Sequence, residues 1–327
     1  MRRRDFFGLA IGSAAFGLPR LTLAQPSGKL PVIAFLGGAT PAMWAPWTGA
    51  FVDRLKALGW IDGQTVKLEF RWTEGRPELI TPLAQELARF NPSVVFGGSN
   101  DMAAIRKAIP VTIPILIVSN DPLGAGLVKN LARPSGNITG VSLQNLDLAN
   151  KRFELLREVV PRIRRLAIMA DANVTPTVLE MNTVQALARK FEIEPIPLEI
   201  RRTDHIESAF ARLKTEQADA LYVVINELLN ANRLLIVRSA EAGKLPTIYG
   251  THDWVRSGGL ISYGSNFPAL FARLAEMADS ILRGTKAEDI PVEQPTRFEL
   301  VINLKTSKAI GVTIPATLLA RADDVIE

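Results

Sequence analysis

The feature that most constrains the fold is a pattern of strand-like runs that repeats in the two halves of the chain. Short β-branched runs alternate with amphipathic stretches of helical periodicity, which favours parallel sheets with helices on both faces. Three runs of the first half have counterparts in the same order, 133–135, 127 and 132 residues later: Val32 with Leu166, Val94 with Leu221, and Ile113 with Leu245. Chance similarity of generic α/β units is the alternative, but three matches at nearly one spacing favour two lobes of one design.

The expected strands are the β-branched runs themselves, and they number ten. They are residues 32–36, 66–72, 94–96, 115–118, 140–143, 165–169, 196–199, 220–224, 247–249 and 260–262. The length of 327 residues agrees with two domains, since domains average roughly 100–200 residues. We therefore predict an α/β protein with two similar Rossmann-like lobes, each a parallel sheet flanked by helices.

The first 24 residues predict an export signal. Three arginines at positions 2–4 precede an apolar stretch over 9–18, and Thr-Leu-Ala at 22–24 ends the segment with compact side chains. This is the pattern of a secretory signal peptide, so we expect cleavage near Ala24 and a mature protein in the periplasm. The segment 3–7 (Arg-Arg-Asp-Phe-Phe) favours the twin-arginine route. An arginine-rich Sec signal is the alternative.

Composition excludes several classes of function. The chain has no cysteine and only two histidines, which argues against thiol catalysis, iron–sulfur clusters and histidine-rich metal centres. Outside 1–24, 34 basic and 32 acidic residues nearly balance, so nucleic-acid binding has no electrostatic support. No later stretch reaches 18 apolar residues, and no nucleophile elbow, phosphate-binding loop or His-Glu-x-x-His motif occurs. We expect no enzyme, no cofactor, no metal and no membrane insertion.

Candidate binding residues lie in the loops after the predicted strands, because ligands of open parallel sheets bind beyond the carboxyl ends of the strands. Ser99 and Asn100 precede a helix that begins near Asp101. Backbone donors there suit a carboxylate or another anion, or either residue is simply an N-cap. Asp121 and Asp253 are acceptors for an ammonium or hydroxyl group of a ligand, or they brace their own loops as Asx-turns.

Aromatic residues follow the same strand ends. Trp44, Trp47 and Trp254 are stacking surfaces for a ring or an apolar ligand, or they are core residues. His252 lies in a loop of the expected cleft. No second convincing ligand group accompanies it, so we do not expect it to hold a metal.

Several segments after residue 30 carry a family resemblance. They are 51–59 (FVDRLKALG), 69–77 (EFRWTEGRP), 113–115 (IPI), 131–140 (LARPSGNITG), 258–264 (GGLISYG), 291–295 (PVEQP), 298–306 (FELVINLKT) and 314–326. From about Pro31 to Glu327 the chain resembles the ABC-transporter substrate-binding proteins of the tryptophan/tyrosine-binding type, with the type 1 periplasmic binding fold. The chain departs from the family pattern at Trp44 and Trp47, which narrow the expected cleft.

The resemblance implies two lobes joined by a multi-strand hinge. The first lobe is expected over 25–142 plus 259–290, and the second over 143–258 plus 291–327. Hinge strands are expected near 140–143, 258–260 and 288–295. By position, the resemblance also assigns ligand contacts to a set of residues in the strand-end loops: Ser99, Asn100, Asp121, Asn226, Asp253 and Thr40, with Trp44 beside them.

The resemblance further implies the function. A small-molecule solute, an amino acid or an aromatic acid, is captured between the lobes by hinge closure and delivered to an ABC permease in the membrane. The alternative is a sensory binding protein that presents its ligand to a membrane receptor. An exported enzyme is disfavoured because no catalytic constellation is present, and a signal peptide stands where a repressor would carry its DNA-binding head.

Overall fold

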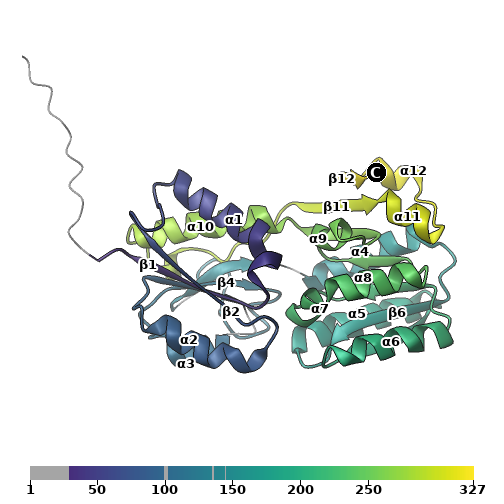
Figure 1. Cartoon of the computed structure of the whole chain (residues 1–327), viewed down its shortest axis with the longest axis horizontal. Helices are drawn as coiled ribbons and strands as arrows, with labels where there is room; N and C mark the ends of the chain where they lie inside the picture. The colour runs from purple at the N-terminus through teal and green to yellow at the C-terminus, as the bar shows by residue number, and fades with distance from the viewer. Residues whose placement is uncertain (1–28, 99–101, 135, 144) are drawn as a thin grey trace, which may run out of the picture.

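The described part of the chain folds around two separate β-sheets. The computed structural model describes residues 29–327 except 99–101, 135 and 144, so the predicted export signal lies outside the described residues. The strand orders are β2-β1-β3-β4-β5 and β12-β11-β10-β9-β8-β6-β7. Figure 1 shows the two sheets side by side, each with its own helices. We call them the first and second lobe, and this α/β architecture confirms the predicted fold class.

The first lobe contains five parallel strands: β1 (Val32–Gly37), β2 (Lys67–Trp72), β3 (Val94–Gly98), β4 (Ile115–Ser119) and β5 (Ile138–Ser142). Its helices are α1 (Pro41–Ala57), η1 (Pro77–Leu79), α2 (Ile80–Ala88), α3 (Met102–Ala108), α10 (Phe267–Leu282) and η3 (Ala287–Asp289). Helices α1 and α10 cover one face of the sheet, and α2 and α3 cover the other (Figure 1). Because side chains alternate along β1, Phe35 packs under α1 and α10 while Leu36 packs toward α2 and α3.

The second lobe contains seven strands: β6 (Arg165–Asp171), β7 (Glu194–Ile200), β8 (Ala220–Val223), β9 (Thr247–Tyr249), β10 (Ile261–Ser265), β11 (Phe298–Asn303) and β12 (Asp324–Ile326). Its helices are α4 (Asn145–Val159), α5 (Thr175–Lys190), α6 (Asp204–Thr215), α7 (Glu227–Ala231), α8 (Arg233–Ala242), α9 (His252–Arg256), α11 (Leu304–Ile310) and α12 (Ala316–Leu319). Strand β11 is antiparallel to β10, and the other pairs are parallel. Two buried clusters fill this lobe, one under α4 and α5 and one under α6 and α8.

The predicted strands correspond to β1 through β10, and β11 and β12 are additional. Two expected boundaries are wrong. Residues 291–293 were expected in the second lobe, but Glu293 pairs with β5 of the first lobe, between Gly140 and Ser142. Residues 259–265 were expected in the first lobe, but β10 pairs with β9 through Ile261 and Ile248 and also with β11, and it therefore belongs to the second sheet. The expectation failed because a buried strand has the same sequence pattern in either sheet.

Within the residues that the structure describes, three segments connect the lobes. The chain passes between them after β5, between β10 and α10, and between η3 and β11. The second passage lies a few residues later than the expected 258–260. The third runs along β5, where Glu293 forms an isolated parallel bridge with Val141.

Candidate functional site

A cleft lies where the two lobes face each other. It is lined by residues at the carboxyl ends of parallel strands: Ala39, Gly98, Val118, Asn120 and Leu143 from the first lobe, and Val174, Ile225 and Asn226 from the second. Its atom-free space, including the part open to solvent, is about 730 Å³. This is the position at which open α/β sheets bind ligands.

The first lobe supplies an aromatic wall. Thr40 caps α1 by accepting a hydrogen bond from the Met43 amide at 3.4 Å, and the helix then carries Trp44 and Trp47 one turn apart. Phe267 and Phe271, four residues apart on α10, meet them, with ring centroids 4.5 Å apart for Trp47–Phe267 and 5.7 Å apart for Trp44–Phe271. This wall offers edges and faces of rings to an apolar part of a ligand.

The second lobe supplies a polar wall at α7. Asn226 caps this helix by accepting from the Leu229 amide at 3.0 Å, and its Nδ2 donates to Asp171 at 2.5 Å. The Oδ1 of Asn230 accepts from the Trp254 indole at 2.8 Å. Because these bonds fix the two amides, their orientation is set before any ligand arrives. With its oxygen engaged, Asn230 can offer its amide N–H groups as donors at the cleft.

A side-chain hydrogen bond joins the two lobes beside the cleft. The indole Nε1 of Trp47, in the first lobe, donates to Oδ2 of Asp253, on α9 of the second lobe, at 2.9 Å. Both residues are buried. The other carboxylate oxygen of Asp253 lies 3.5 Å from His252 Nε2. Burial lowers the pKa of Arg233, and the Asp253 carboxylate partly offsets that effect.

The cleft continues outward into a wider groove of about 1290 Å³. The two spaces share Val174, Asn226 and Glu227. A Cβ on Gly38 would lie 2.7 Å from the Cγ of Glu227, so any larger residue at position 38 would have to displace the Glu227 side chain. The groove adjoins the inner cleft at the three shared residues.

Only some of the predicted site residues lie at the cleft. Trp44 and Asn226 line the cleft, and Asp253 is bonded to Trp47 at the junction of the lobes. Asp121 accepts from the Gly124 amide at 2.8 Å, the Asx-turn that was its alternative role. Ser99 and Asn100 lie outside the described residues.

Sequence reasoning did not select several residues that line the cleft. They are Asn120, Glu227, Asn230, Phe267 and Phe271. Asn120 stands directly before Asp121. The sequence analysis therefore selected the loop that reaches the cleft, but named the residue next to the one that lines it. The spacing of Phe267 and Phe271 by four residues on one helix was a usable signal for a shared face.

Metal binding has no structural basis in the described part of the chain, where no group of three or more His, Asp or Glu side chains is placed to hold an ion. His252 is buried between Asp253 and Glu299, 3.5 Å from each carboxylate. Within the described residues, no helix is both long and apolar enough to span a bilayer.

Comparison with known proteins identifies the family. The profile of the ABC transporter substrate binding proteins matches residues 29–326, and the chain belongs to this family. It is 25% identical over 261 residues to a tyrosine-binding protein of Clostridioides difficile, covering 80% of this chain and 75% of that protein. A solved ABC domain from Streptococcus pneumonia in complex with L-Trp is 25% identical, with a TM-score of 0.81 over 91% of this chain and 100% of that chain.

A second solved structure is similar in fold. The ligand-free, open structure of a substrate binding protein with adhesive properties from Clostridium difficile is 23% identical, with a TM-score of 0.65 over 91% of this chain and 99% of that chain.

Proteins of the family bind a small molecule and work with a permease. Their function is binding rather than catalysis, and they are extracytoplasmic.

Proposed function

We propose that this protein is the periplasmic solute-binding component of an ABC importer and captures an amino acid or an aromatic acid between its lobes by hinge closure. The observation that carries the proposal is the cleft itself, with an aromatic wall from α1 and α10 and fixed amides from α7. Residues 1–24 act as the export signal, and the twin-arginine pattern at 3–7 gives the route.

The chemistry of the two walls supports this ligand class. The rings of Trp44, Phe267 and Phe271 suit an apolar or aromatic side chain, because most of a bound ligand's surface is buried against such groups. Asn226 and Asn230 suit the polar end of an amino acid or acid, since amides both donate and accept hydrogen bonds. The tyrosine-binding relative and the L-Trp complex agree with this choice.

The connections between the lobes support closure as the mechanism. Short segments join the sheets, whereas each lobe has its own buried clusters. A solute bound to one wall gains contacts with the other wall only when the lobes approach, which favours the closed form. The permease then recognises the closed form.

Thermal unfolding of the purified protein from Gln25 onward tests the proposal. L-tyrosine, L-tryptophan, L-leucine, 4-hydroxybenzoate and D-glucose are added separately. A solute at 100 times its dissociation constant stabilises the folded state by about 2.7 kcal/mol, which raises the melting temperature visibly. We expect a shift with an amino acid or with the aromatic acid. A shift with glucose alone, or with none of the five, contradicts the proposed ligand class.

A matched pair of variants locates the site. Asn230 and Asn232 are two residues apart at the end of α7, and of the two it is Asn230 that lines the cleft. Asn230→Ala is expected to weaken binding of the stabilising solute, whereas Asn232→Ala leaves its dissociation constant unchanged. Equal loss in both variants would show that the cleft is not the binding site.

A further inference from the structure

A hydrogen bond between two protein side chains connects the lobes beside the cleft, from the indole of Trp47 to the carboxylate of Asp253, 206 residues apart in sequence. Building on the proposed function, we propose that Trp47 is a lobe-bridging residue whose bond to Asp253 stabilises the closed cleft independently of solute and thereby sets the affinity for solute. Both atoms of the bond belong to the protein. Closure therefore has a contribution that no solute has to supply.

The surroundings of Trp47 hold its indole in place. Its ring packs against Phe267 at 4.5 Å, Trp44 at 5.2 Å and Phe271 at 5.7 Å between centroids, all within the first lobe. The side chain is 5% exposed. Because these contacts lie on one lobe, they orient the indole N–H toward the second lobe without depending on closure. Little side-chain entropy is then lost when the bond to Asp253 forms.

The acceptor is equally well placed. Asp253 is 9% exposed on α9, and Asn303 of the same lobe holds the end of α9 by donating to the Val255 carbonyl at 3.2 Å. The carboxylate faces the indole N–H through Oδ2, and Arg233 contributes a nearby positive charge. A hydrogen bond to a charged acceptor is stronger than a neutral one, and in a buried position it shifts an equilibrium by roughly ten- to a hundredfold.

The consequence for solute binding follows from linkage. A solute that binds the closed form has an apparent dissociation constant equal to the intrinsic constant divided by the closed fraction. The Trp47–Asp253 bond raises that fraction. The same indole occupies part of the cleft, so Trp47 also limits the size of the solute that fits beside Trp44 and Phe267.

The test measures closure with no solute added. The chain has no cysteine, so Glu78→Cys and Arg202→Cys place a fluorescent donor and acceptor at exposed positions on the two lobes beside the outer groove. The protein is dialysed in urea and refolded to remove co-purified solute, and single-molecule energy transfer then gives the closed-to-open ratio. Trp47→Phe keeps a ring and removes the N–H, and we expect this ratio to fall by about tenfold or more.

The chain provides a matched control. Trp60 donates from Nε1 to Asp279 Oδ1 at 2.7 Å, the same pair of groups, but within the first lobe. Trp60→Phe is expected to leave the closed-to-open ratio unchanged. Asp253→Asn tests the same bond from the other side, and the double variant Trp47→Phe/Asp253→Asn should lower the ratio no further than the stronger single change.

The outcomes separate this inference from the proposed function. If Trp47→Phe and Trp60→Phe give the same solute-free ratio as the parent protein, the bridging role is overturned, whatever solute binds. If Trp47→Phe alone opens the cleft, the bridging role holds even when L-tyrosine and the other probes fail to bind. A ratio lowered equally by Trp60→Phe also overturns it, because the effect would then be one of general stability.

Discussion

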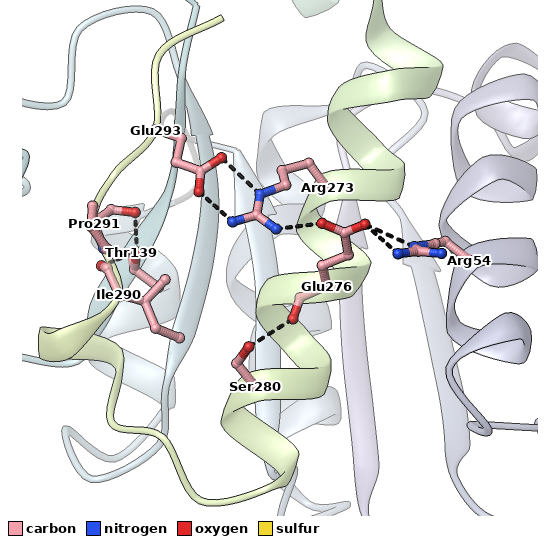
Figure 2. A network of polar contacts seen from close by, with 8 residues as sticks. All are labelled: Arg54, Thr139, Arg273, Glu276, Ser280, Ile290, Pro291 and Glu293. Atoms are coloured by element: carbon pink, nitrogen blue, oxygen red, sulfur yellow. Dashed lines mark hydrogen bonds and ion pairs between the residues drawn. The ribbon is translucent and has the colours of Figure 1, made fainter.

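Arg273 on α10 donates to both carboxylate oxygens of Glu293, from Nε at 2.8 Å and from Nη2 at 2.6 Å (Figure 2). Glu293 lies in the third connecting segment, and its backbone also pairs with β5 through the Gly140 carbonyl and the Ser142 amide. Thr139 Oγ1 donates to the Ile290 carbonyl at 2.7 Å. These bonds attach the segment to the first lobe as far as Glu293, so we expect bending during closure at residues 294–297.

The same network predicts a pH dependence of stability. Hydrogen bonds from Arg273 and Arg54 hold the pKa of Glu276 below its usual value (Figure 2). A carboxyl with a lowered folded-state pKa stabilises the protein above its unfolded-state pKa, and this contribution disappears as the pH falls through the folded-state value. Glu276→Gln is therefore expected to lower the free energy of unfolding at pH 7 by less than about 1 kcal/mol.

Urea unfolding at pH 7 and pH 3 measures this difference. The difference in the free energy of unfolding between the parent protein and Glu276→Gln should be smaller at pH 3 than at pH 7, because the carboxyl loses its charge as the pH falls. The same substitution at the exposed Glu78 serves as a control and should have little effect at either pH. A difference of equal size at both pH values would rule out the ion-pair explanation.

Alanine substitutions at two glycines are expected to change the free energy of unfolding in opposite directions. Gly140 in β5 has a φ of +141°, and a Cβ there would lie 2.1 Å from the Ile117 carbonyl oxygen. Gly140→Ala should lower the free energy of unfolding by about 2–4 kcal/mol. Gly49 lies inside α1. Apart from its two chain neighbours and the backbone of its own helix, no atom of the described residues comes within 4 Å of the place an alanine methyl would take, so Gly49→Ala should raise the free energy of unfolding by about 0.5–1 kcal/mol. Urea titration of both variants provides the measurement, and a stable Gly140→Ala protein would contradict the close strand packing.

A buried ion pair stabilises the interior of the second lobe. Arg152 Nη1 lies 2.9 Å from Glu180 Oε1, and the Tyr222 hydroxyl donates to the same oxygen at 2.7 Å. Burial raises the pKa of Tyr222, so the phenol remains a neutral donor. Glu180→Ala leaves a buried guanidinium without its main partner and should destabilise the protein by about 3–5 kcal/mol.

The exposed ion pair Lys151–Glu154 provides the comparison with the buried pair, because Lys151 directly precedes Arg152 on α4. Glu154→Ala should change the free energy of unfolding by less than about 0.5 kcal/mol, because solvent screens this pair. Chemical denaturation followed by circular dichroism distinguishes the two variants. Similar losses in both would mean that burial of Glu180 does not govern its contribution.

Substitutions at two helix caps distinguish an effect on stability from an effect on solute binding. Asn226 caps α7 at the cleft, and Asn303 caps α11, where its Oδ1 accepts from the Thr306 amide at 3.0 Å. Each change to Ala should lower the free energy of unfolding by about 1 kcal/mol through the lost cap. Asn226→Ala should also weaken solute binding directly, and by more than Asn303→Ala, which reaches the cleft only through the end of α9. Isothermal titration with the solute identified by thermal unfolding checks this, and a parallel loss of affinity in Asn303→Ala would contradict it.

The strands could be predicted well because their signal is local. A run such as 165–169 predicts β6 by its own apolar, β-branched pattern, and the pleat of a strand needs no distant partner to produce that pattern. The cleft was predicted to the level of loops. Asn226, predicted to contact the ligand, lines the cleft, whereas near Asp121 it is the neighbouring Asn120 that lines it. A loop sequence does not reveal which of two adjacent side chains points outward.

By itself, the sequence determined where ten strands lie along the chain, the presence of two wound lobes and the resemblance to the substrate-binding family. Only the tertiary structure decided that β10 joins the second sheet, that Phe267 and Phe271 complete the wall begun by Trp44, and that Trp47 bonds to Asp253. The physical reason is one of range. Helix and strand periodicity depends on neighbours a few residues apart, whereas these contacts depend on how whole lobes pack, which no local pattern encodes.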